Sequence, residues 1–318
     1  MRNRDERAAV VGGERAQVGR GPGYGIALSI WAPDIPGVSG ANVAHTLEAV
    51  IGIPLSTTWR VRGSRPTTGL RAPPGTWVAF DRWFPAADDG NASCTGGLTE
   101  ILETRRHALA RFIRSHPGAS AVLLLYGAKV PGHPDGGFNL ANSEVRRLAS
   151  MGVDIIFGYC AAPPPKSIDG WLRMPTGVRL RNRLDAVSSR FFVAGHFDVA
   201  ELVQTVGLQP NEARFEVPGD FRYTQSLWKL HWKYELWRDP IGSTPEGLLS
   251  RAVKTVAPIR QQLAQFTQAN SLRSEIAVYV IAHRVSALAV RLDRRELKVV
   301  AESGAALDVW FYLNADVT

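Results

Sequence analysis

The stretch at residues 286–313, SALAVRLDRRELKVVAESGAALDVWFYL, decides the fold of this chain. Leu288 to Leu292 alternates apolar with small or charged residues, which is the period of a half-buried strand. The next segment, Asp293 to Ser303, has the composition of a short helix, and Leu307 to Leu313 is an almost wholly apolar strand. This stretch predicts a β-α-β unit.

An earlier stretch, residues 136–159 (GGFNLANSEVRRLASMGVDIIFGY), follows the same order. Phe138 and Leu140 stand 152 residues before Val290 and Leu292. Further residues match in type at nearly the same separation: Glu144-Val145 with Glu296-Leu297, Gly152 with Gly304, Asp154 with Asp308, and Phe157 with Phe311. The separation is 154 residues for the last two pairs, so we expect Asp154 and Phe157 to be equivalent to Asp308 and Phe311.

The match continues toward the N-terminus. Asn42-Val43-Ala44 opens a helical stretch that ends at Gly52, and Asp198-Val199-Ala200 opens one that ends at Gly207. Asn and Asp are preferred helix caps, and glycine suits the left-handed position after a last turn. Because 155 residues separate Gly52 from Gly207, the chain is predicted to contain a duplication of residues 42–159 as 198–313.

Each copy reads β-α-β-β-α-β followed by β-α-β. The first four strands and two helices have the order of a ferredoxin-like unit, in which helices cover one face of an open sheet. The predicted fold class is therefore α/β (α+β), with two tandem ferredoxin-like βαββαβ sandwiches, each extended by β-α-β. The expected elements of the first copy are strands at 26–30, 57–61, 77–83, 121–126, 138–140 and 153–159, with helices at 42–52, 98–116 and 142–150; those of the second are strands at 191–194, 214–217, 228–236, 276–282, 288–292 and 307–313, with helices at 198–207, 249–266 and 293–303.

Composition divides the chain into four predicted parts. Residues 1–23 are polar and rich in Gly and Arg, which predicts a disordered N-terminal arm. Residues 24–162 form the first α/β repeat, 163–189 a Pro-rich linker, and 190–318 the second repeat. At 318 residues the chain can bury two full cores.

Charge and composition argue against several classes of function. Of the net charge of +8, the arm and the linker carry +5, so the repeats are nearly neutral and nucleic acid is not expected as a partner. The longest apolar runs are of strand length, and no secretory signal begins the chain, so we expect a cytoplasmic protein without a membrane span. Cys94 and Cys160 have neither disulfide nor zinc spacing.

No residue pattern indicates catalysis, a cofactor or a metal, so we expect no catalytic, cofactor-binding or metal-binding residues. His196 precedes Asp198 by two residues and could form an acid/base pair, but Asp198 is more simply a helix cap. The remaining histidines lack ligand spacing.

Two surface patterns leave a partner-binding role open. Trp228, Trp232 and Tyr234 alternate along one strand and favour core packing, with a binding hot spot as the alternative. Four arginines on one helix favour a solvated face, with an acidic partner as the alternative: Arg105, Arg106, Arg111 and Arg114. The residues that bind a partner stay unknown at this level.

The motifs of the second copy are a helix ending in Val-Gly-Leu-x-Pro (Val206 to Pro210), a Trp-rich strand (Trp228 to Trp232), a long amphipathic helix and a final Leu-Asp-x-x-Phe-Tyr-Leu strand (Leu307 to Leu313). This series resembles the bacterial domain of unknown function 4279 family. The first copy looks like a diverged member, with Ile51-Gly52-Ile53-Pro54 and Val153 to Phe157 at the first and last motifs. The resemblance implies a small bacterial protein, with immunity proteins of toxin systems as one association.

An open sheet offers edges and an uncovered face to a partner chain. The sequence therefore predicts a non-enzymatic bacterial protein-binding module, an immunity or antitoxin-like protein, with a protein partner and no cofactor. The alternative is a small-molecule-binding regulatory protein with a ligand cleft between the two repeats. A third hypothesis, an enzyme of unrecognised type, requires polar groups of perturbed pKa that converge in one pocket.

Overall fold

The computed structural model describes residues 23–31, 76–85, 95–116, 118–128, 135–160, 184–210, 212–216, 227–237, 244–283, 285 and 287–314. These residues form two mixed sheets with helices packed against them, so the α/β class expected from the sequence is confirmed. Several expected features lie outside the described residues, namely the helix from Asn42, the strand at 57–61, the arm at 1–23 except Gly23, and the linker at 163–189 up to residue 183. Residues 184–189 of the expected linker belong to a strand, β6 (Leu184–Gly195).

Sheet A has the order β10-β5-β3-β1-β2. Its strands are β1 (Gly23–Trp31), β2 (Thr76–Pro85), β3 (Ser120–Ala128), β5 (Asp154–Cys160) and β10 (Ala287–Leu292). Sheet B has the order β4-β11-β9-β6-β8-β7. Its strands are β4 (Asp135–Leu140), β6 (Leu184–Gly195), β7 (Glu212–Glu216), β8 (Leu227–Trp237), β9 (Arg273–His283) and β11 (Ala306–Asn314).

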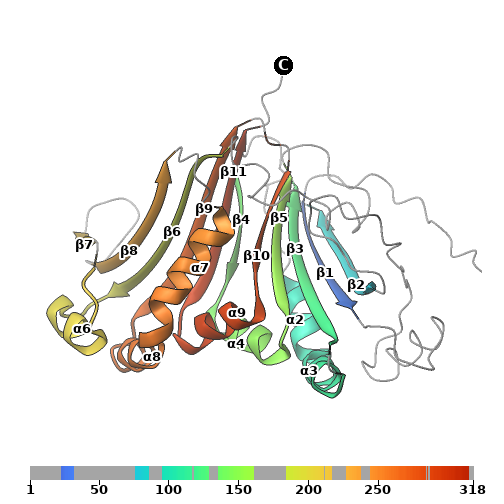
Figure 1. Ribbon diagram of the computed structural model, residues 1–318, viewed down its shortest axis with the longest axis horizontal. Helices are drawn as coiled ribbons and strands as arrows, with labels where there is room; N and C mark the ends of the chain where they lie inside the picture. Colours follow the sequence, from blue (N-terminus) through green and yellow to red (C-terminus); the bar gives the residue numbers. More distant parts are fainter. Residues whose placement is uncertain are drawn as a thin grey trace, which may run out of the picture.

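The two repeats exchange one strand each. Strand β4 belongs to the first repeat by sequence but pairs with β11 in sheet B, while β10 belongs to the second repeat but pairs with β5 in sheet A. In Figure 1 the green β4 lies among the orange and red strands, and the red β10 lies beside the green β5. The sheets therefore do not follow the predicted boundary between the repeats.

The strand registers in the two sheets are equivalent. In sheet A, Leu292 lies opposite Ile155 in an antiparallel pair; in sheet B, Leu140 lies opposite Leu307. Both residues of one pair stand 152 positions from their counterparts in the other. The same separation makes Val309 the equivalent of Phe157, so the predicted match of Phe157 with Phe311 and of Asp154 with Asp308 is wrong by two positions.

Four strands of the second repeat lie side by side in sheet B. Strands β9, β6, β8 and β7 are neighbours in that order, and all three pairings are antiparallel. The chain then continues through β10 into β11, which runs parallel to β9. In the first repeat the counterpart of β7 falls at 57–61, outside the described residues.

Two helices expected as continuous are interrupted. The first is divided into α2 (Thr95–Thr104) and α3 (Arg106–Ser115), where the Thr104 hydroxyl donates to the Glu100 carbonyl and competes with the backbone. The second is divided into α7 (Pro245–Val256), the 3₁₀ turn η2 (Ala257–Ile259) and α8 (Arg260–Ala269), because Pro258 has no N–H for a helical bond. The remaining helices are α4 (Asn142–Met151), α6 (Val199–Val206) and α9 (Arg294–Glu302).

Helices α4 and α9 begin and end in the same way. Glu144 and Glu296, at equivalent positions, each accept a hydrogen bond from the N–H of the residue before the helix, at 2.8 Å and 3.1 Å. Asp293 also caps α9 with its carboxylate, whereas Ala141 has no side-chain acceptor to offer α4. Gly152 and Gly304 follow the two helices with φ angles of 69° and 78°, the left-handed conformation that favours glycine.

A single hydrophobic core joins the two repeats. It includes Leu123 and Phe157 from sheet A, Val278 and Phe311 from sheet B, and Leu249 of α7, all buried. At its centre the rings of Tyr159 on β5 and Phe311 on β11 stack with their centroids 5.9 Å apart and their planes at 12°. These two residues are equivalent by the 152-residue separation, so the centre of the core lies where the repeats meet.

Candidate functional site

The structure assigns structural positions to the histidine and carboxylate that the sequence singled out. Asp198 caps α6 and accepts a hydrogen bond from the N–H of Ala200 at 2.8 Å, and His196 is exposed in the preceding turn. The helix-cap interpretation of Asp198 is confirmed. Of the arginine group on α2 and α3, Arg111 and Arg114 are exposed and Arg105 is half-buried, which lowers its pKa through desolvation.

The aromatic stripe of the second repeat lies on β8. The register places Trp232 opposite Phe191 and Tyr234 opposite Ser189. The side chains of β8 lie outside the described part of the chain, so the choice between core packing and a binding role stays a prediction.

A different group of side chains lies on the outer face of sheet B, the side turned away from the core helices. Alternation along the strands puts Arg190 of β6, Tyr279 of β9, and Asp308 and Trp310 of β11 on this face. The register brings them into adjacent rows: Arg190 and Asp308 both lie opposite Ala277, and Tyr279 lies opposite Trp310. We call Arg190, Glu275, Tyr279, Asp308 and Trp310 the polar cluster.

The equivalent face of sheet A has an apolar centre, with the ion pair of Asp154 and Arg291 at one margin. The centre is formed by a second, smaller core cluster that includes Ala27, Leu124 and Ile156, all buried. The equivalent strand registers pair the positions as follows: Arg190 with Ala27, Glu275 with Val122, Asp308 with Ile156, Trp310 with Gly158, and Tyr312 with Cys160. At these five positions sheet B carries charges and large aromatic rings where sheet A carries aliphatic and small residues, whereas Tyr279 has Tyr126 as its counterpart.

Asp308 is the most constrained member of the polar cluster. Its side chain is close to fully covered, since the residue is only 7% exposed, and its Oδ2 accepts a hydrogen bond of 2.6 Å from the indole N–H of Trp310. Its Oδ1 is buried and makes no hydrogen bond within the described part of the chain. Burial, with a smaller contribution from the charge of Glu275, raises the pKa of Asp308 to about 6, against the lowering effect of the hydrogen bond from Trp310.

The other members of the polar cluster are already paired. Glu275 is 2% exposed and forms an ion pair with the exposed guanidinium of Arg273. The guanidinium of Arg190 lies over the ring of Tyr279, 5.3 Å from its centroid, as in a cation–π contact. Burial, with the charges of Asp308 and Glu275, raises the pKa of Tyr279 to about 12, so this phenol stays neutral at physiological pH.

The margin of this face is apolar. Ile281 is 37% exposed and lies opposite Tyr312, which is half-buried. Trp310 extends over the neighbouring strand, because a Cβ on Gly137 would come within 2.7 Å of its indole ring. The outer face of sheet B thus combines a polar centre with an aromatic and aliphatic margin.

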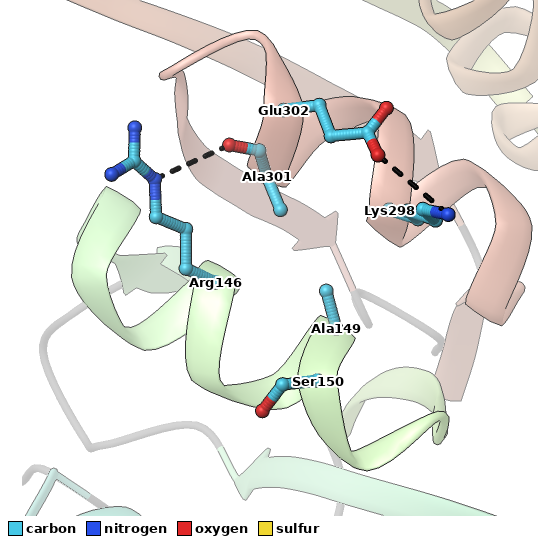
Figure 2. Close-up of a pocket in the computed structure, with 6 residues that line it drawn as sticks. All are labelled: Arg146, Ala149, Ser150, Lys298, Ala301 and Glu302. Atoms are coloured by element: carbon cyan, nitrogen blue, oxygen red, sulfur yellow. Dashed lines mark hydrogen bonds and ion pairs between the residues drawn. The ribbon is translucent and has the colours of Figure 1, made fainter.

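A shallow depression of about 320 Å³ lies between α4 and α9 (Figure 2). Its lining consists of equivalent positions from the two repeats: Arg146 and Lys298, Ala149 and Ala301, Ser150 and Glu302. The Arg146 Nε donates to the Ala301 carbonyl at 3.4 Å, and Glu302 pairs with Arg260 and Lys298 at 2.6 Å and 3.7 Å. The depression is open to solvent and its charged side chains are mostly engaged.

Within the described ranges, no group of three or more His, Cys, Asp or Glu side chains could hold a metal ion. None of the described helices has the length and apolar character needed to cross a membrane. The pKa-perturbed groups of the polar cluster, Tyr279 and Asp308, lie on a sheet face.

The sequence contained a signal for the polar cluster that the sequence interpretation did not use. Glu275 and Asp308 each interrupt an otherwise apolar strand, and a carboxylate in such a strand is rarely buried without a role. The residue pattern presents Asp308 as the counterpart of Asp154 and as part of the Leu-Asp-x-x-Phe-Tyr-Leu motif, and neither of these indicates a site. No family model, curated protein or solved structure matches this chain.

Proposed function

We propose that this protein is a protein-binding module that engages its partner through the outer face of sheet B, in the manner of an immunity or antitoxin-like factor. The observation that carries the proposal is the difference between the two outer faces. Where sheet A has Ala27, Ile156 and Gly158, sheet B has Arg190, Asp308 and Trp310. Tryptophan, tyrosine and arginine dominate the binding energy of protein interfaces.

The stability of the fold gives no reason for this difference. Sheet A shows that aliphatic and small residues at these positions pack well, since Ala27, Leu124 and Ile156 are all buried. A buried carboxylate such as that of Asp308 opposes folding unless it is fully hydrogen-bonded. At the equivalent positions sheet A carries residues that pack stably. Residues that lower stability at such positions are typical of binding surfaces.

Site-specific photo-crosslinking tests the proposal. A photoreactive phenylalanine at Ile281, the exposed apolar residue at the margin of the face, is introduced into the full chain in cells that encode it. We expect a discrete covalent adduct, identified by mass spectrometry, whose partner then binds the purified protein. Trp310→Ala is expected to weaken that binding at least about tenfold.

The matched control places the same photoreactive residue at Lys298, which is 70% exposed on the helical side of the molecule. This position is not expected to give the adduct. Absence of an adduct at Ile281, or the same adduct from both positions, would contradict the proposal.

The alternative, a small-molecule-binding regulator, is favoured by the depression between α4 and α9, where both repeats contribute equivalent residues (Figure 2). Its volume of about 320 Å³ is at the small end for a ligand site. Protein binding is better supported because the depression is open and Glu302 is paired. A ligand-dependent rise in melting temperature that Ala301→Trp abolishes would favour the alternative.

A further inference from the structure

We propose that Asp308 is the recognition site for a single basic group, the guanidinium or ammonium of an arginine or lysine side chain on the partner, held against the rings of Trp310 and Tyr312. This inference rests on the proposed function, because it names the chemistry of the group that the outer face of sheet B accepts. It adds a ligand class and a receiving atom, Oδ1 of Asp308.

The first argument is charge balance on this face. Among the described side chains of β6, β9 and β11, two cations and two carboxylates lie on this face: Arg190, Arg273, Glu275 and Asp308. Glu275 pairs with Arg273, and Arg190 lies over Tyr279. In this set Asp308 is the carboxylate without a cation at ion-pair distance, and the charge that complements it is positive.

The second argument is the unused acceptor. Asp308 is more than nine-tenths buried, Oδ2 accepts the Trp310 N–H, and Oδ1 has no hydrogen bond in the described structure. A buried acceptor without a donor lowers stability, and native proteins rarely retain one without a purpose. Because folding has already removed water from this oxygen, an arriving N–H donor does not have to displace it, which favours binding.

The third argument is the surroundings of the carboxylate. Trp310 and Tyr312 flank the same face of β11, and aromatic faces attract cations. Asn139 on β4 lies directly opposite Asp308 and is exposed. Its amide is near enough to lower the pKa of Asp308, although Oδ1 of Asp308 makes no hydrogen bond of normal geometry in the described structure. Asn139 is therefore the neighbouring side chain that competes with an arriving cation for Oδ1.

The titration of Asp308 provides a sharp test, because a basic group binds its ionised form. The charged and titratable groups around it are Glu275, Arg273 and Tyr279 on β9, Arg190 on β6, and Tyr312 on β11. With the carboxyl half-protonated near pH 6, affinity for a cation falls as the pH drops through that value. From about pH 8 to about pH 5 the expected loss is about tenfold.

The experiment uses methylguanidinium as the probe and the indole N–H resonances of the full chain labelled with ¹⁵N-tryptophan. The Trp310 resonance is assigned with Trp310→Phe. We expect it to shift saturably as methylguanidinium is added at about pH 8, and the affinity fitted at about pH 5 to be about tenfold weaker. Trp83, which stacks on Tyr126 in the hydrophobic cluster on the outer face of sheet A, is the internal control and is expected not to shift. Asn139→Ala is expected to strengthen binding.

Two variants separate recognition from structure. Asp308→Asn and Asp308→Ile, the second being the residue of the duplicate, are expected to fold, to gain stability at about pH 8 and to lose the response to methylguanidinium. The inference is overturned if the Trp310 shift is absent, if it persists in these variants, or if it does not depend on pH. An equal shift with acetate, an anion, would also overturn it, as would the failure of both variants to fold. Since the crosslink at Ile281 is independent of this probe, the inference can fail while the proposed function holds.

Discussion

Tyr159 and Phe311 stack at the centre of the core with centroids 5.9 Å apart and planes at 12°. The two residues occupy the same position in the two repeats, one on β5 of sheet A and the other on β11 of sheet B. We predict that Tyr159→Leu and Phe311→Leu are each destabilising and that their effects are not additive. Stacked aromatic pairs contribute about 0.5–1.5 kcal/mol beyond their buried area, so a double-mutant cycle in urea should give a coupling free energy of that size. A coupling near zero would show that the stacking contributes nothing.

The exchange of β4 and β10 predicts that the repeats unfold together. Each sheet contains a strand from the other repeat. If one repeat unfolds, the other sheet therefore loses an edge strand and the strand beside it is exposed. We expect one urea transition, with tryptophan fluorescence and circular dichroism coinciding. A protease site placed within residues 161–183 offers a second measurement, because the cleaved chain should still elute as one species. Two transitions, or separation of the fragments, would contradict this prediction.

Gly136 on β4 allows the Tyr159 ring to approach the exchanged strand. A Cβ at this position would lie 2.1 Å from the ring Cε2 atom, and the ring is buried in the core. Gly136→Ala is therefore expected to destabilise the protein by about 1–3 kcal/mol, the range for overpacking. Gly207→Ala is the control, since φ is 71° there but nothing lies within 4 Å, and the expected effect is about 1 kcal/mol of backbone strain. Tyr159→Leu should reduce the effect of Gly136→Ala in the double mutant, and additivity would refute the contact.

Asp154 joins the exchanged strand β10 and helix α9 to sheet A. Its Oδ2 accepts from the Arg291 guanidinium, and its Oδ1 accepts from the backbone N–H of Arg294 at 2.9 Å. The Asp154 side chain is 13% exposed, so Asp154→Ala should destabilise by about 2–4 kcal/mol in denaturant titration. In the exposed pair of Arg82 and Glu100, Glu100→Ala should change stability by no more than about 1 kcal/mol. Equal effects would mean that the contacts of Asp154 are as weak as those of a surface pair.

The pKa of Asp308 predicts how stability depends on pH. Its value of about 6 in the folded chain exceeds the ordinary 3.8, so between these values the folded state binds more protons than the unfolded state. The free energy of unfolding therefore falls by on the order of 2–3 kcal/mol as the pH rises from about 4 to about 6. Above about pH 6 the contribution of Asp308 no longer changes with pH. Asp308→Asn should remove this part of the dependence. The measurement is the difference in unfolding free energy between the two proteins at several pH values, and a difference independent of pH would contradict it.

The sequence predicted the elements better than their partners. The alternation around Leu288 and Val290 identified a strand, and its 152-residue match to Phe138 and Leu140 is reproduced in the strand registers. The exchange was beyond sequence reasoning because duplicated strands have similar patterns and fit either sheet. Matching Asp154 to Asp308 by residue type gave an equivalence two positions off, which preserves the alternation and so leaves no sign of error.

The polar cluster could not be predicted as a site for a related reason. Periodicity identifies which face of a strand is buried, but Glu275 and Asp308 lie on different strands and only the parallel pairing of β9 with β11 brings them together. The pairing of Arg190 with Tyr279 likewise depends on the pairing of β6 with β9. Residue spacing along the chain does not contain that information.

The reciprocal placement of β4 and β10 means that a single copy of this unit could complete both sheets only as a dimer, by lending a strand to an identical chain. In such a homodimer every substitution appears twice, so both outer faces must change together. In one chain that contains both units the two faces are free to differ, as they do at the equivalent positions Ile156 and Asp308.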